Sequence, residues 1–277
     1  MAVAANVSEI DHGRDILRDS RGVIVLTGAG LSVDSGLVTF RGSGGHWKKH
    51  RPEDLATLEA FHRDPRLVWE WYEERRRAAA KSRPNDAHRA IAEFALRRDD
   101  VVIATQNVDG LHTLAAREAV MGDKYSKQPR VSFTDGGDAN RALPLELHGT
   151  FYSVRCTSCG LCCEHRDLID VSSKETLPHC DDCGSLMRPN VVWFGEPLGE
   201  VIERAFDCAS RSDACLIVGT SAVVQPAANV AIVTQQAGGV IIEVNPNETL
   251  LTPMCEVSLR DTAAMAVPPL LTPDVDG

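Results

Sequence analysis

The sequence lacks the features of membrane, secreted and nucleic-acid-binding proteins. No apolar run approaches the roughly 20 residues that a membrane-spanning helix needs, and residues 1–19 show no charged-then-apolar signal pattern. The basic excess that gripping nucleic acid requires is also missing, because the formal net charge of the chain is -10. We therefore expect a soluble, cytoplasmic protein that binds neither membranes nor nucleic acid.

Two further bulk features bear on the fold. Apolar residues make up 43% of the 277 residues, enough for a sizeable core. The chain has nine cysteines. In an intracellular protein these indicate metal binding or free thiols more than disulfides.

Short apolar runs that end in small or polar residues predict an α/β fold with a parallel sheet. The runs are 23–26, 101–104, 214–218 and 240–244, and helical stretches lie between them. The run 101–104 leads into Thr105-Gln106-Asn107-Val108-Asp109-Gly110, and a later segment carries Glu146-Leu147-His148-Gly149. Ligands bind at the carboxyl edge of such sheets. Taken alone, the polar residues have helix capping as an equal alternative.

A glycine-rich turn follows the first of these strands. Thr27-Gly28-Ala29-Gly30-Leu31-Ser32 leads from the strand into a predicted helix start, an arrangement that presents backbone N–H groups to a pyrophosphate. The usual dinucleotide fingerprint has a glycine where this chain has Val33. An ordinary tight turn is the alternative.

Asn85 is a candidate N-cap of one predicted helix. The helix before it is predicted to begin at Asp64-Pro65, with Asp as N-cap and Pro in the first turn. Val68, Tyr72 and Arg75 then share one face of this helix. A phenol and a guanidinium placed in this way can hold a carboxylate between them. The alternative is that residues 75–77 form a solvated basic run and Tyr72 belongs to the core.

Two Cys-x-x-Cys pairs predict a structural zinc site. Cys156 and Cys159 form the first pair, and Cys180 and Cys183 form the second. Four thiolates close a tetrahedral Zn²⁺ shell and leave no position for water. Cys162 and Cys163 lie nearby, but the regular spacing favours the outer pairs, and reduced free thiols are the alternative.

Two other segments carry less certain signals. Residues 188–196 suggest an extended strand that ends in a turn and, with an open edge, pairs with a peptide backbone. Residues 115–144 lack a period from Met121 onward and suggest an insertion, either a lid near His148 or inert surface.

Together these motifs resemble the sirtuin (Sir2) family of NAD-dependent protein deacylases, from about Val23 to Pro268. The resemblance rests on the following stretches: Gly28–Ser32, Phe40-Arg41, Thr105–Asp109, Leu147–Gly149, the two cysteine pairs, Val192–Glu196, Gly219–Ser221 and Val244-Asn245. It implies a Rossmann-like large domain, a small domain of zinc ribbon plus helices, and NAD bound between them.

The resemblance also implies roles for particular residues. NAD would contact the pyrophosphate and lid residues Gly28, Ala29, Gly30, Ser32, Phe40 and Arg41, the nicotinamide-side residues Gln106, Asn107 and Asp109, and the adenosine-side residues Gly219, Thr220, Ser221, Asn245 and Ala263. His148 would be the general base, with Asn107 as a second catalytic residue. Residues Val192, Phe194, Gly195 and Glu196 would pair with an acyl-lysine peptide.

The implied reaction consumes NAD as a co-substrate. The acyl-lysine oxygen attacks the nicotinamide ribose, nicotinamide leaves, and His148 then activates a ribose hydroxyl. Water completes the reaction, and the products are nicotinamide, free lysine and O-acyl-ADP-ribose. Histidine suits the base role because its ordinary pKa lets it accept a proton near neutral pH.

Two departures from the family pattern stand out. The family usually has Pro-Asp where this chain has Val38-Thr39. Thr39 resembles the class III branch, which removes acidic acyl groups and also carries a Tyr-x-x-Arg match to Tyr72 and Arg75. The second departure is the long insertion before His148. We therefore expect succinyl or malonyl groups to be preferred over acetyl.

We divide the chain into two domains on this basis. Residues 1–41, 87–149 and 187–277 form the Rossmann-like NAD-binding domain, and residues 42–86 and 150–186 form the small domain. Two other functions remain open at this point. One is protein mono-ADP-ribosylation on the same scaffold, and the other is a non-catalytic zinc-ribbon binding module.

Overall fold

A six-stranded parallel sheet forms the large unit of the computed structural model, which describes residues 7–39, 51–121 and 138–272. The strand order is β3-β2-β1-β7-β8-β9. The strands are β1 (Val23–Thr27), β2 (Val101–Thr105), β3 (Leu145–Glu146), β7 (Ala214–Val218), β8 (Val240–Val244) and β9 (Val257–Leu259). Every residue of β1 and β7 is buried, as in sheets covered on both faces. The predicted parallel α/β sheet is confirmed.

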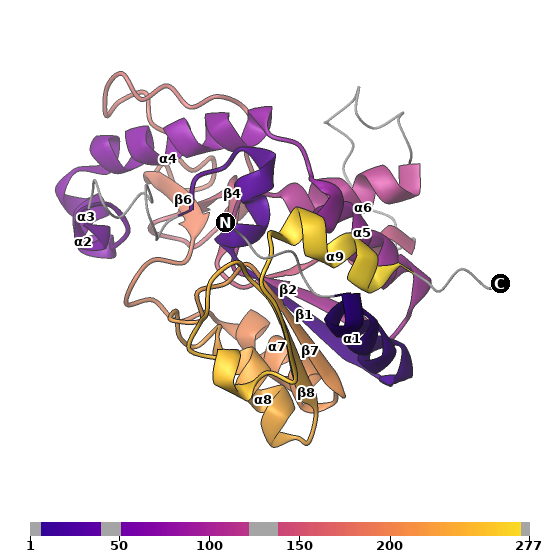
Figure 1. Cartoon of the computed structure of the whole chain (residues 1–277). Helices are drawn as coiled ribbons and strands as arrows, with labels where there is room; N and C mark the ends of the chain where they lie inside the picture. Colours follow the sequence, from indigo (N-terminus) through magenta and orange to yellow (C-terminus); the bar gives the residue numbers. More distant parts are fainter. Residues whose placement is uncertain (1–6, 40–50, 122–137, 273–277) are drawn as a thin grey trace.

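Helices cover both faces of this sheet (Figure 1). One face packs against α1 (Val7–Asp19), α5 (Asp86–Arg97), α6 (Leu111–Met121) and α9 (Ala263–Leu271). The other face packs against α7 (Glu200–Ser210) and α8 (Asn229–Gln236). The cavity described below must therefore lie at an end of the strands.

A second unit combines a small antiparallel sheet with three helices. The sheet has the order β5-β4-β6, with strands β5 (Cys162–Glu164), β4 (Gly149–Cys156) and β6 (Met187–Val191). Its core is shared with α2 (Pro52–Leu55), α3 (Leu58–Arg63) and α4 (Pro65–Lys81). In Figure 1, α4 lies beside β4 and β6. Strand β6 thus pairs within this sheet, although our sequence-based division begins the second large segment at residue 187.

The two predicted helix starts are confirmed by their caps. The Asp64 carboxylate accepts a hydrogen bond from Leu67 N at 3.1 Å, and Pro65 occupies the first turn of α4. The Asn85 side chain accepts from the N–H groups of Ala87 and His88 at the start of α5. Both caps satisfy N–H groups that the helix itself leaves without partners.

Only the ends of the predicted insertion belong to the described residues. Helix α6 covers its first part, and the 3₁₀ helix η4 (Asp138–Ala142) covers its last part. Residues 122–137, and with them the proposed lid, lie outside the described residues. In the three described ranges, no helix is both long and apolar enough to cross a membrane.

Candidate active site

A cavity of about 990 Å³ lies where β1, β2, β7 and β8 end and the small unit begins. The predicted site residues that line it are Gly28, Ala29, Gly30, Tyr72, Gln106, Asn107, His148, Val192, Phe194, Gly195, Glu196, Gly219, Thr220, Ser221, Asn245 and Ala263. Residues from eight separate stretches of the sequence thus meet at one cavity. Gln106 and Asn107 of the polar run after β2 therefore line this cavity, so the run does more than cap a helix.

The glycine turn packs directly on the turn that follows β7. Gly28 N donates to Val218 O at 3.0 Å, and Gly30 N donates to Gly219 O at 2.8 Å. A Cβ on Gly30 would lie only 2.7 Å from Gly219 O, so any side chain there would force the two turns apart. The turn continues into a 3₁₀ helix, η1 (Ala29–Ser35), where the sequence predicted an ordinary helix start. The result is bare backbone at the cavity wall.

Two of the predicted cofactor residues lie behind this wall and do not line the cavity. Ser32 Oγ donates to Asp109 Oδ2 at 2.8 Å, and Asp109 Oδ1 accepts from Leu111 N at 2.9 Å. Burial raises the pKa of Asp109, and the hydrogen bonds from Leu111 and Ser32 oppose this shift. Asn107 Nδ2 donates to Gly28 O at 3.1 Å, which connects the polar run to the glycine turn. Ser32 and Asp109 therefore support the residues that line the cavity without facing it themselves.

A second set of contacts joins the ends of β2, β7 and β8. Gln106 Nε2 donates to Thr220 Oγ1 at 2.9 Å, and Asn245 Nδ2 donates to Thr220 O at 2.8 Å. Gln106 and Asn245 thus fix the turn at Thr220 from both sides. These hydrogen bonds to Thr220 also hold the side chains of Gln106 and Asn245 in place at the edge of the cavity.

His148 stands at the junction of β3 and β4, with its ring at the cavity. Its Nδ1 lies 3.1 Å from Gln106 O. Because a carbonyl oxygen only accepts, Nδ1 carries the proton and Nε2 keeps a free lone pair. Burial lowers the pKa of His148, and the bond to Gln106 O partly offsets this. The ring is therefore neutral and basic at neutral pH, as a general base must be.

Comparison with known proteins gives this arrangement a family. The profile of the Sir2 family matches residues 28–123 and 138–226. A Thermococcus kodakarensis protein named NAD-dependent protein deacylase is 42% identical over 266 residues, which cover 95% of this chain and 94% of that protein. The chain belongs to the Sir2 family.

Solved structures of other Sir2 proteins share the fold of this one. A Sir2 homologue in complex with NAD superimposes with a TM-score of 0.80 at 38% identity, over 97% of this chain and 94% of that one. A Sir2 protein bound to an acetylated peptide gives a TM-score of 0.73 at 28% identity, over 92% and 94% of the two chains. The two-unit architecture is thus that of the Sir2 fold.

In this Sir2 protein the predicted pair Tyr72 and Arg75 is placed unevenly. Tyr72 is 3% exposed and lines the cavity, whereas Arg75 is 8% exposed and does not line it. The Arg75 guanidinium lies over the ring of Trp71, 3.5 Å from its centroid, and Nη1 donates to Trp71 O at 2.6 Å. Burial lowers the pKa of Arg75 to about 10, so the group stays charged at neutral pH. The Trp71 ring, which lines the cavity, thus contacts the Arg75 charge, which does not line it.

Several lining residues had no role in the sequence-based assignment. Trp71, Phe151 and Trp193 form an aromatic part of the wall near Tyr72. Trp71 and Phe151 have only the sequence signal of ordinary core residues, whereas Trp193 lies within the Val192–Glu196 stretch of the family resemblance. Val38 and Thr39, which together make the first departure from the family pattern, also line the cavity. The predicted contacts of Phe40 and Arg41 lie outside the described residues.

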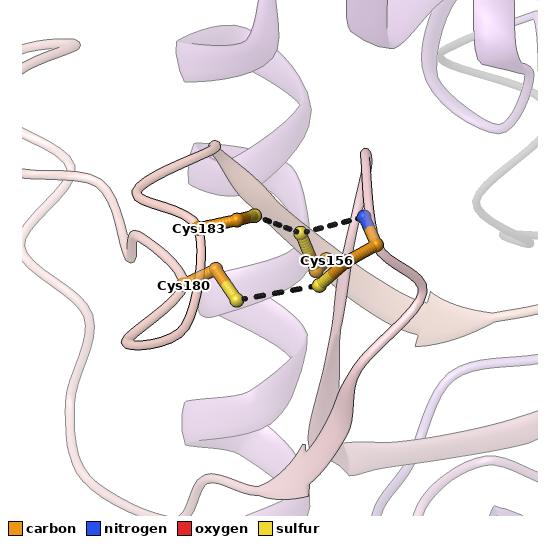
Figure 2. A group of neighbouring side chains, drawn as sticks. Cys156, Cys180 and Cys183 are labelled. Atoms are coloured by element: carbon orange, nitrogen blue, oxygen red, sulfur yellow. Dashed lines mark hydrogen bonds between the residues drawn. The ribbon is translucent and has the colours of Figure 1, made fainter.

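The four predicted zinc ligands form one cluster, and Figure 2 labels three of them, Cys156, Cys180 and Cys183. The sulfur atoms of Cys156, Cys159, Cys180 and Cys183 all lie within 4.8 Å of one another. The Cys156–Cys183 and Cys159–Cys180 sulfur distances are 3.4 and 3.7 Å, close to the roughly 3.8 Å expected for thiolates around a tetrahedral zinc ion. The cluster excludes Cys162 and Cys163, as predicted. The donor set fits a closed, structural zinc site.

Proposed function

We propose that this Sir2 protein is an NAD-dependent protein-lysine deacylase that releases nicotinamide and O-acyl-ADP-ribose. The observation that carries the proposal is the single cavity shared by the glycine turn, the amides of Gln106 and Asn107, the His148 ring and the 192–196 edge. The names of the curated relatives, and the NAD and acetyl-peptide complexes of the Sir2 neighbours, support it.

Each part of the cavity suits one part of the two substrates. The backbone at Gly28–Gly30 offers close approach for a pyrophosphate. Amide side chains at Gln106 and Asn107 suit the carboxamide end of a nicotinamide. The Thr220 and Asn245 end lies at the far strands β7 and β8, where the adenosine half would extend.

His148 is the general base in this proposal. With Nδ1–H held by Gln106 O, Nε2 accepts the proton of a ribose hydroxyl, which then attacks the acyl carbon. The lowered pKa of His148 keeps the ring neutral below its ordinary pKa of about 6.5. We therefore expect acidification to lower the deacylation rate only below that pH.

Residues 192–196 would hold the peptide near the base. Val192 N donates to His148 O at 2.9 Å, which fixes the edge relative to the catalytic ring. Phe194 is 45% exposed at the rim and offers an apolar surface to a peptide. Glu196 is occupied by Arg188 and by Trp193 N, so it would shape the edge and leave peptide binding to its neighbours.

We also propose that acidic acyl groups, succinyl and malonyl, are removed in preference to acetyl. The Tyr72 hydroxyl at the cavity wall would donate to the distal carboxylate. The Arg75 charge behind Trp71 would attract that carboxylate, and a turn of the guanidinium away from Trp71 O would bring it into direct contact.

The test is a rate series over acetyl-, malonyl- and succinyl-lysine peptides with NAD, followed by nicotinamide release. Arg75→Met should lower kcat/KM for the succinyl peptide by about 10-fold or more, because a buried charge partner is lost, and should affect the acetyl peptide much less. Arg77→Met is the matched control, since that side chain is half exposed on the same helix. An unchanged succinyl rate in Arg75→Met contradicts the carboxylate role of Arg75, whereas equal acetyl and succinyl rates in the wild type contradict the acidic preference; neither result contradicts the deacylase proposal.

A further inference from the structure

The Trp193 side chain touches the cavity but has no assigned role. It is 2% exposed, lines the cavity and donates its indole N–H to the Tyr72 hydroxyl oxygen, with Nε1 and Oη 2.9 Å apart. The two residues are 121 positions apart in the sequence. This contact joins the peptide-binding edge to the helix that would choose the acyl group.

The direction of this hydrogen bond is fixed by chemistry. An indole nitrogen is a donor only, so the Tyr72 oxygen must accept, and its own O–H points elsewhere. Burial raises the pKa of Tyr72, so the hydroxyl keeps its proton. Among the residues that the structure describes, no acceptor for this O–H is recorded. Because Tyr72 lines the cavity, the proton is available to a ligand there.

Trp193 is itself held rigidly. The Arg188 guanidinium lies over its ring, 3.5 Å from the centroid. Arg188 Nη2 donates to Glu196 Oε2 at 2.9 Å and to Val191 O at 2.7 Å, and Trp193 N donates to the same Glu196 oxygen at 2.8 Å. Phe61 packs against the indole with ring centroids 5.4 Å apart. The indole N–H is therefore a preorganised donor.

We propose that Trp193 is a specificity-determining positioning residue. Its indole N–H holds the Tyr72 hydroxyl as a donor for the distal carboxylate of a succinyl- or malonyl-lysine. An acetyl group has one oxygen, which the reaction itself uses, so it has no acceptor for this donor. The inference rests on the proposed deacylase function and names a residue that sets its acyl preference.

Trp193→Phe tests the role because it keeps an aromatic ring and removes the N–H. We expect KM for a succinyl-lysine peptide to rise roughly 5-fold, and roughly 10-fold in Tyr72→Phe, from the usual worth of such hydrogen bonds. In both variants kcat should change little, since the contact is remote from the reacting carbon. The ratio of succinyl to acetyl kcat/KM should fall accordingly.

A double variant and a matched control separate positioning from damage. Trp193→Phe combined with Tyr72→Phe should lose no more than Tyr72→Phe alone, because both act through one hydroxyl. Trp69→Phe removes another buried indole N–H from the same core, where Nε1 donates to Met187 O at 3.0 Å, away from the cavity. It should lower the melting temperature while the acyl ratio stays at the wild-type value.

The outcomes are distinct. If wild type prefers succinyl and Trp193→Phe keeps that ratio, the role of Trp193 is overturned and the acidic preference stands. If the double variant loses the product of the single losses, the two residues act independently and the inference is again wrong. If wild type shows no acidic preference, that part of the proposed function fails and Trp193 loses its role with it. Absence of nicotinamide release from any peptide would count against the deacylase itself.

Discussion

Arg76 is expected to be the residue that fastens helix α4 to the zinc-bearing unit. Its side chain is 5% exposed and lies among three backbone carbonyls: Nη1 donates to Phe151 O at 2.5 Å, and Nη2 donates to His165 O and Asp167 O, both at 2.9 Å. Nε lies 3.0 Å from Oε2 of the buried Glu73. Helix α4 also carries Tyr72, so these contacts of Arg76 help to set the position of Tyr72 at the cavity wall.

The substitution Arg76→Met removes the charge and keeps most of the apolar stem. It leaves the buried carboxylate of Glu73 and three backbone carbonyls, two of them only partly buried, without that donor. Breaking a buried pair in this way typically costs about 3–5 kcal/mol. Arg77→Met is the comparison, because Arg77 binds the same carboxylate at 3.1 Å but is 53% exposed. An exposed pair is worth at most about 1 kcal/mol.

Urea unfolding followed by tryptophan fluorescence measures the difference. With a slope of about 3 kcal/mol per molar urea, the Arg76→Met midpoint should lie roughly 1–1.7 M below wild type. The Arg77→Met midpoint should lie within about 0.3 M of wild type on the same slope. Equal urea midpoints for Arg76→Met and Arg77→Met would show that Arg76 does not fasten α4 to the small unit.

Two further predictions concern the metal and the buried histidine. Cys180→Ser should lose the zinc and have a lower melting temperature than wild type. Cys163→Ser, which lies outside the cluster, should retain about one zinc per chain by elemental analysis. Zinc retention in Cys180→Ser would contradict the ligand assignment. Burial lowers the pKa of His112 from an ordinary 6.5 to about 4, so between these pH values the unfolded chain binds a proton that the folded chain does not. Stability should therefore fall as pH drops from 6.5 to 4, by about 3 kcal/mol from this group, and His112→Gln should flatten that slope in urea titrations; an unchanged slope would contradict the assignment.

Local signals in the sequence were sufficient for the elements that local chemistry determines. Asp64-Pro65 and Asn85 marked the starts of α4 and α5, and the apolar runs marked four strands of the large sheet. The cysteine spacing alone selected the four clustered thiols over Cys162 and Cys163. These signals work because caps, strand burial and metal hooks act over a few residues.

Contacts between distant segments had no such signal. The run Arg75–Arg77 looks uniform in sequence, yet only Arg77 is solvated, because the helix turns Arg76 into the small unit and Arg75 onto Trp71. Likewise, the Trp193–Tyr72 contact depends on how β6 approaches α4. Strand β6 itself was not separable from the large unit by sequence pattern. In each of these cases the position of the side chain or strand depends on the packing of segments that are far apart in the sequence.

The most direct test of the proposed function is a product balance. Wild-type protein incubated with NAD and a succinyl-lysine peptide should release nicotinamide, free-lysine peptide and O-succinyl-ADP-ribose in equal amounts, measured by mass spectrometry. His148→Ala should abolish formation of the last two. Radiolabel from NAD bound covalently to protein, with no acyl-ADP-ribose formed, would contradict the account and favour ADP-ribosyl transfer.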